Sequence, residues 1–404
     1  MRARSHRFPR KDKEYEDTTY YDETDNCLDI GYQRLKKMSL KYPELSYITK
    51  LLADQNNLTH LPDPKYIPHL EQLCCSYNRL VEIPFYPYLT FLNISHNSIS
   101  DLSSYHNSKL VYLDCSANPK LNITYDLPYC LQFYTSENQL DHLNISKIPR
   151  IQYLDCSHNN LESISYSNTL LELNIQYNRL RVLPSNPKLI HLTCDHNDIE
   201  SIGSYNELLT LNVSHNGLSQ IPSLPKLTDL MASHNRISIL GFLPKVVLVD
   251  LSHNSLNHFN VPPNISYLSL QFNPIQDLHL DSDMMTHLKE LQISFDLYSK
   301  LYHKYYDQFD FATVDLDKTK LNALSLKLNG VFGDKIINYI NKKFDTIKFT
   351  DRDKIFPMIV QGIYQRYFGE QDTDSGEKFR ILYEGIGKIY YKCLVATMYF
   401  NDYE

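Results

Sequence analysis

The chain has 404 residues, of which 42% are hydrophobic and 22% are charged. This balance excludes a wholly disordered chain, and no run of about 18 apolar residues is present that would span a membrane as a helix. The 40 Lys and Arg residues are outnumbered by 47 Asp and Glu residues, which gives a net charge of −7. Without a basic excess, nucleic acid is not an expected partner, and a membrane is not expected either.

Residues 1–26 precede any regular pattern. Basic residues such as Arg2 and Lys11 are followed by acidic ones, without a hydrophobic periodicity or the apolar core of a signal peptide. We therefore expect a disordered tail over residues 1–26 and no export through a signal peptide.

A repeated apolar pattern occupies residues 27–298. Clear copies are IQYLDCSHNNLESI from Ile151 and LLTLNVSHNGLSQIP from Leu208, and the template reads L-x-x-L-x-[LICV]-x-x-N-x-[LI]-x-x-[LI]. Two degenerate copies, with Gln33 and Asp296 in place of the asparagine, flank the regular ones, so the pattern predicts about 14 stacked repeats. The regular copies are anchored on Asn56, Asn78, Asn97, Asn118, Asn138, Asn159, Asn178, Asn197, Asn216, Asn235, Asn254 and Asn273.

Each copy predicts one short strand, a turn and a return segment. The alternation over residues 153–157 predicts a strand with Leu154 and Cys156 pointing inward and Tyr153, Asp155 and Ser157 pointing outward. Only about 8–10 residues remain for the return, which is too short for a full helix and favours extended or 3-10 backbone.

This pattern resembles the leucine-rich repeat family, of the short-repeat type, over about two thirds of the chain. The resemblance implies an α/β-type solenoid with a parallel β-sheet on its concave side and a mostly extended or 3-10 convex side. The richness in Asn, Tyr, Ile and Lys, together with the short repeats, further resembles leucine-rich repeat proteins of giant amoeba viruses.

The repeated polar residues inside the template have structural interpretations. An asparagine amide can satisfy backbone groups of two neighbouring repeats, so the twelve asparagines predict a structural ladder without chemistry. Cys75, Cys115, Cys156 and Cys194 lie at inward positions of alternate repeats, about 10 Å apart, which exceeds the reach of a disulfide. We expect free thiols and an intracellular, cytoplasmic location, in the host cytoplasm if the protein is viral.

One histidine precedes the ladder asparagine in each of four successive repeats, at His196, His215, His234 and His253. A metal ion needs ligands that converge on one point, whereas a linear series along the repeat axis does not converge. No C-x-x-C pair occurs in the chain either. We therefore expect no metal and no other cofactor.

Residues 299–404 lack the repeat template. Helical periodicity in stretches such as 334–344 and 377–400 predicts a small helical C-terminal region with three to five helices. The region contains no phosphate-binding glycine motif, and Cys393 lies in an apolar context without the Cys-x-Asp of bacterial leucine-rich repeat ubiquitin ligases. The sequence leaves the role of this region and the oligomeric state open.

The outward strand positions predict the binding surface, because the concave side of a solenoid is an extended face. An aromatic patch interleaved with short polar residues favours the core of a protein interface, although exposed strand formers chosen for β propensity would give the same pattern. We predict non-enzymatic protein–protein recognition; the alternative is a substrate-recognition subunit or effector linked to a ubiquitination-type machine through residues 299–404. The candidate residues are Phe91, Asn93, Tyr112, Asp114, Tyr134, Tyr153 and Asp155.

Overall fold

A computed structural model of the chain describes residues 20–22, 24–38, 43–280, 287–293, 297 and 314–316. The chain divides into two compact units, Met1–Val249 and Asp250–Glu404. None of the helices in these described residues is long and apolar enough to cross a membrane.

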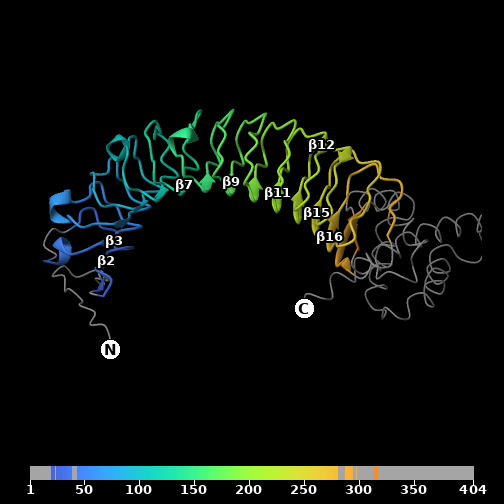
Figure 1. The fold of residues 1–404 in the computed structure, drawn as a ribbon. Coiled ribbons are helices and arrows are strands. Elements are labelled where there is room, and N and C mark those ends of the chain that lie inside the picture. The colour runs from blue at the N-terminus through green and yellow to red at the C-terminus, as the bar shows by residue number, and fades with distance from the viewer. Residues whose placement is uncertain are drawn as a thin grey trace, which may run out of the picture. The chain divides into compact units, whose positions relative to one another are not determined.

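Every predicted repeat of the first unit contributes one strand, and Figure 1 shows the strands along the inner side of this unit's arc. Successive strands pair in parallel without a shift of register: Tyr153 lies opposite Glu172, and Leu154 lies opposite Leu173. The strands are β2 (Cys27–Asp29), β3 (Lys50–Leu52), β4 (Gln72–Cys74), β5 (Phe91–Asn93), β6 (Tyr112–Asp114), β7 (Gln132–Tyr134), β8 (Tyr153–Asp155), β9 (Glu172–Asn174), β10 (His191–Thr193), β11 (Thr210–Asn212) and β13 (Asp229–Met231).

The first unit also contains a strand within the segment that the sequence predicts as a disordered tail. Tyr20–Asp22 form β1, which pairs antiparallel with β2. The pairing covers an edge of β2 that would otherwise present unpaired backbone groups. Tyr20–Asp22 therefore correct the predicted limit of the tail, and residues 1–19 lie outside the described residues.

The second unit continues with parallel strands. β16 (Tyr267–Ser269) pairs with β17 (Glu290–Ile293), and β17 pairs with β18 (Val314–Leu316); β15 (Leu248–Asp250) lies where the two units divide. β18 lies beyond the predicted solenoid limit of residue 298, in the region predicted as helical. The template does not find it because the residues after Leu316, Asp-Lys-Thr-Lys, include no ladder asparagine. The predicted helices of residues 320–400 lie outside the described residues.

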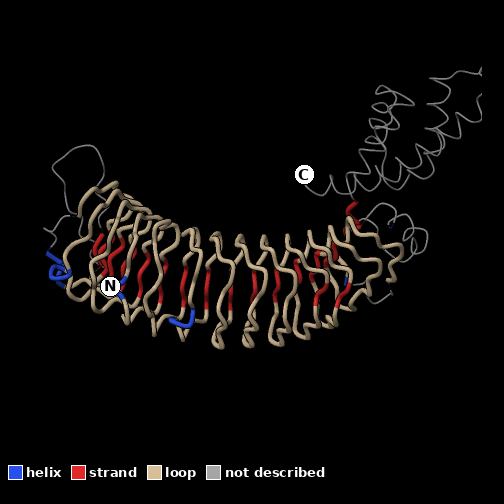
Figure 2. Tube along the Cα trace, turned by 90° about the horizontal axis from the view of Figure 1, so that it is seen from above, coloured by secondary structure: helices blue, strands red, loops and turns tan. Residues whose placement is uncertain are grey.

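The return segments confirm the predicted convex side, with little helix (Figure 2). Among the described residues of the first unit, 3-10 turns occur only in the repeats whose anchor residues are 21 or more positions apart, because the additional residues fit a tighter turn of lower rise. Two of the 19-residue repeats instead pair their extended return segments, as β12 (Gln220–Ile221) with β14 (Ile239–Leu240). The 3-10 turns are η1 (Pro43–Ser46), η2 (Pro64–Tyr66), η3 (Ser103–Tyr105) and η4 (Ile145–Lys147).

The core follows the template with one correction. Leu154 and Cys156 are buried as predicted, but Ser157, predicted to point outward, is only 3% exposed. The strand ends at Asp155, two residues earlier than predicted, and the chain turns at His158, whose φ is 52°. The backbone N–H of Ser157 donates to Asp155 Oδ1 at 2.9 Å, which stabilises this turn.

The ladder asparagines bridge neighbouring repeats, and Asn178 is a representative example. Its Nδ2 donates to the carbonyl of Cys156 in the preceding repeat at 3.0 Å and to that of Ile175 in its own repeat at 3.1 Å. Its Oδ1 accepts from the backbone N–H of Leu161 at 2.9 Å. One buried side chain therefore satisfies backbone groups on both sides of a turn.

The cysteines confirm the prediction of free thiols for the described residues. Cys75, Cys115, Cys156 and Cys194 are all buried and unpaired. Burial, together with the carboxylate of Asp54, raises the pKa of the partly exposed Cys74 to about 12. These thiols are therefore poor nucleophiles at neutral pH.

Candidate functional site

The predicted aromatic patch lies on the face of the sheet, where three rings follow one another across β5, β6 and β7. The rings of Phe91 and Tyr112 stack with their centroids 4.1 Å apart and an interplanar angle of 8°. Tyr112 and Tyr134 are 5.4 Å apart. Phe91 and Tyr112 are paired in register, whereas Gln132 lies opposite Tyr112, so Tyr134 completes the series diagonally. We call Phe91, Tyr112 and Tyr134 the aromatic row.

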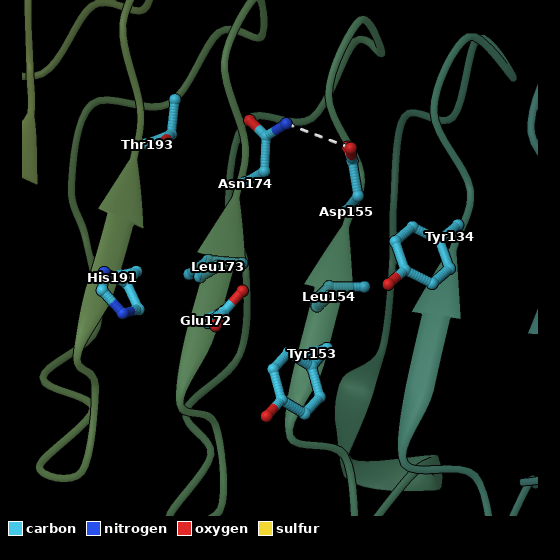
Figure 3. Close-up of a pocket in the computed structure, with 9 residues that line it drawn as sticks. All are labelled: Tyr134, Tyr153, Leu154, Asp155, Glu172, Leu173, Asn174, His191 and Thr193. Carbon is cyan, nitrogen blue, oxygen red and sulfur yellow. Dashed lines mark hydrogen bonds between the residues drawn. The ribbon is translucent and has the colours of Figure 1, made fainter. Parts of the chain in front are cut away.

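Beside the aromatic row, the face is hollowed over β7 to β10 (Figure 3). The hollow has a volume of about 180 Å³. The buried side chains of Leu154 and Leu173 form its floor. We call this depression the concave hollow; it is lined by Tyr134, Tyr153, Leu154, Asp155, Glu172, Leu173, Asn174, His191 and Thr193.

The candidate residues thus fall into two adjoining groups. Tyr134, Tyr153 and Asp155 line the concave hollow, and Tyr134 also ends the aromatic row formed with Phe91 and Tyr112. Asn93 and Asp114 lie opposite each other at the ends of β5 and β6, outside the hollow. Glu172, Asn174, His191 and Thr193 are lining residues that the sequence analysis did not select, although the strand register places them next to Tyr153 and Asp155.

The short polar residues at the strand ends also have a structural role. Asn93 Oδ1 accepts from the backbone N–H of Ser95 at 3.0 Å, and Asp114 Oδ1 accepts from that of Ser116 at 3.1 Å. Asp155 makes the same contact with Ser157, and its Oδ2 accepts from Asn174 Nδ2 at 3.0 Å. These side chains therefore shape the turn after each strand.

The face carries more acidic than basic side chains over β4 to β13, and Lys50 lies on the neighbouring β3. The strand residues of β4 to β13 on this sheet include no Lys or Arg, but they include Asp114, Asp155, Glu172 and Asp229. Burial raises the pKa of the Asp114 carboxyl, although hydrogen bonds from Ser116 lower it. Burial also raises the pKa of the Tyr134 hydroxyl, and the carboxylates of Glu172, Asp114 and Asp155 raise it further.

Asp114→Asn is expected to stabilise the protein at pH 7. Because the folded-state pKa of Asp114 lies above its ordinary value of 3.8, the ionised carboxylate costs stability at neutral pH, and this cost disappears as the pH falls through the raised pKa. Asparagine preserves the turn, since Asn212 accepts the equivalent bond from Ser214. Urea unfolding should give a higher midpoint for the variant at pH 7, and this advantage should shrink as the pH falls toward and below 3.8. A lower midpoint at pH 7 would contradict the desolvation argument.

A second series of rings runs along the turns at the ends of the strands, at the position before each ladder asparagine. His158, Tyr177, His196, His215 and His234 stack in sequence, with centroids 4.1–4.4 Å apart. All five have φ between 52° and 54°, the left-handed region that non-glycine residues rarely adopt.

Hydrogen bonds between neighbouring turns hold the left-handed backbone of these residues, and the arrangement of the rings does not suggest a metal site. The backbone N–H of His196 donates to Ser214 O in the next repeat at 3.0 Å, so the left-handed residue is held by the neighbouring turn. The stacked rings are nearly parallel, with interplanar angles of 11–20°. Among the described residues, no group of three or more His, Cys, Asp or Glu side chains is arranged to hold a metal ion.

No family model matches the chain. A leucine-rich repeat protein of Acanthamoeba polyphaga mimivirus is 47% identical over 420 residues, and the match covers 100% of both chains. At this identity over the whole length, the repeat pattern and the region after it are both represented in the relative.

Solved structures with the same repeat architecture are more distant. The leucine-rich repeat protein LIC12759 of Leptospira interrogans superposes with a TM-score of 0.60 at 20% identity, over 72% of this chain and 83% of that chain. The functional domain of InlJ from Listeria monocytogenes, which includes a cysteine ladder, gives a TM-score of 0.52 at 22% identity, over 67% of each chain. At these identities the likeness concerns the fold alone.

Proposed function

Because the chain belongs to the leucine-rich repeat family, we propose that it is a non-enzymatic recognition module that binds a protein partner on the concave face of its sheet. The proposed contact residues are Phe91, Asn93, Tyr112, Asp114, Tyr134, Tyr153 and Asp155.

The observation that carries this proposal is the aromatic row. Phe91, Tyr112 and Tyr134 are each partly exposed on one face and already ordered by stacking on one another. Rigid, partly exposed aromatic side chains lose little conformational entropy on binding and dominate the energetics of protein interfaces. The concave hollow beside the row adds a depression that a partner side chain can fill.

We place this activity in the cytoplasm of an infected host cell. The relative at 47% identity is a protein of an amoeba virus, and the described cysteines are unpaired thiols, which suits a reducing compartment. The alternative of a link to ubiquitination depends on residues 299–404, of which the structure describes only Val314–Leu316.

The experiment compares affinity purification from amoeba lysate with the wild-type chain and with Tyr112→Ala/Tyr153→Ala. We expect recovery of a protein partner to fall at least about tenfold in the double variant, because both rings lie in the proposed contact surface. Tyr166→Ala is the matched control, because Tyr166 is 56% exposed and lies on a return segment. Equal recovery with all three chains would contradict the proposal, provided that their thermal unfolding is unchanged.

A further inference from the structure

We propose that the concave hollow receives a basic side chain, in the first place arginine, from an exposed basic segment of the protein partner. The inference rests on the proposed function, since it assumes that the concave face binds a protein. It adds the chemical class of the partner and the place where the contact is made.

The shape of the hollow fits one side chain. Its volume of about 180 Å³ lies below the range of about 300–1,000 Å³ that is usual for small-molecule pockets. In Figure 3 the rings of Tyr134 and Tyr153 and the carboxylate of Glu172 lie around one opening above Leu154. A side chain that enters there meets two aromatic rings and a carboxylate above an apolar floor.

The chemistry of the lining fits a planar cation. Tyrosine faces attract a guanidinium through the ring quadrupole, and a guanidinium forms paired hydrogen bonds with a carboxylate more readily than an ammonium does. Leu154 and Leu173, at 3% exposure each, provide the apolar contact that suits the methylene stem of arginine.

The residues that line the hollow include no lysine or arginine, and their one histidine, His191, lies opposite Glu172. Glu172 is exposed, and among the described residues its carboxylate has no hydrogen-bond donor and no ion-pair partner. Asp155 is held by Ser157 and Asn174, both of which are uncharged. The nearest other acidic residues on the strands are Asp114 and Asp229. Their negative charges add to those of Asp155 and Glu172.

The same field argues against other classes of ligand. Phosphate groups of nucleic acids or lipids would be repelled by the carboxylates of Asp114, Asp155 and Glu172. A partner cation, in contrast, is attracted by these carboxylates. The acidic face therefore favours a complex with a basic partner.

The test uses two fluorescein-labelled peptides, four repeats of Gly-Ser-Arg and four repeats of Gly-Ser-Glu, titrated with the full-length chain by fluorescence anisotropy. We expect the arginine peptide to bind and the glutamate peptide not to bind. Glu172→Gln should weaken the arginine peptide by about 3–10-fold, because it removes the unpaired charge and retains the shape of the side chain.

Glu162→Gln is the matched control. Glu162 is exposed on the return segment of the same repeat as Tyr153 and Asp155, so the substitution changes the net charge equally without altering the hollow. A similar loss of affinity in both variants would mean that the peptide senses only net charge and would overturn the inference. Binding of the arginine peptide no tighter than the glutamate peptide would also overturn it.

The inference and the proposed function fail in different ways. If a cellular partner is lost with Tyr112→Ala/Tyr153→Ala but is retained at full recovery with Glu172→Gln, the concave face binds a protein and the basic-side-chain contact is wrong. If the partner is lost with Tyr112→Ala/Tyr153→Ala and weakened with Glu172→Gln but not with Glu162→Gln, both are supported. If none of these variants alters recovery, the concave face is not the binding surface.

Discussion

Asn178→Ala is expected to lower the free energy of unfolding by about 2–4 kcal/mol, because the side chain joins two repeats in the middle of the first unit. Its removal leaves the buried N–H of Leu161 without its acceptor. The carbonyl of Cys156 still accepts from Asn159, and that of Ile175 still accepts from Asn197. The loss is therefore close to that of one orphaned donor, because both of these carbonyls keep another donor, and it is smaller than the number of broken bonds suggests.

Asn178→Asp should be more damaging than Asn178→Ala at neutral pH. The aspartate retains an acceptor for Leu161, but it places a second oxygen where Asn178 Nδ2 donates to the carbonyls of Cys156 and Ile175. A carboxylate among carbonyl oxygens is repelled and has lost water. If Asn178→Asp is more destabilising than Asn178→Ala, the amide donors are essential for the ladder. If Asn178→Ala is the more destabilising variant, this interpretation is wrong.

Urea unfolding monitored by circular dichroism checks both variants. Asn168→Ala is the control, since Asn168 is exposed on the segment that precedes β9, and its effect should stay within about 0.5 kcal/mol. Because stability in a solenoid is a sum over neighbouring repeats, weakening one interface near the middle should also reduce the steepness of the transition. An unchanged midpoint in Asn178→Ala would mean that water replaces the ladder at no cost.

The architecture was predictable because the sequence repeats the same template of strand, turn and return segment many times. Leu154 and Leu173 have the same template position, and the structure pairs them directly. One polar residue, Thr135, occupies an inward position that is otherwise apolar. Its hydroxyl accepts a hydrogen bond from Nδ2 of the ladder residue Asn138 at 2.6 Å, so it is not left unsatisfied. Tyr20–Asp22 and Val314–Leu316 were missed because strands at the two ends carry no ladder asparagine.

The site was less predictable, because it depends on residues that the template leaves variable. Residue spacing identified Tyr134, Tyr153 and Asp155, but the boundary of the concave hollow depends on how large the neighbouring side chains are. Glu172 lies opposite Tyr153, and His191 lies opposite Glu172, so the hollow spans three neighbouring strands above the buried side chains of Leu154 and Leu173. Register predicts adjacency, whereas a depression also depends on side-chain volume.

The return segments approach one another so closely at one position that only glycine fits there, and the sequence pattern does not predict this. In the first unit, Gly241 follows β14 and lies directly against the return segment of the preceding repeat. Its N–H donates to Ile221 O at 2.7 Å, and a Cβ added there would meet Ser223 N at 2.3 Å and the Pro222 carbonyl carbon at 2.4 Å. These atoms belong to the backbone, so they cannot move away as a flexible side chain would.

Gly241→Ala should therefore lower the free energy of unfolding by about 1–3 kcal/mol, the usual cost of inserting a methyl group into closely packed structure. Gly203→Ala is the matched control, because a Cβ at Gly203 meets nothing within 4 Å; it should be neutral or stabilise by up to about 1 kcal/mol through the unfolded chain. Differential scanning calorimetry of both variants measures the difference. Equal effects would contradict the steric argument, whereas a loss confined to Gly241→Ala would show that the shortest repeats need direct backbone contact between their return segments.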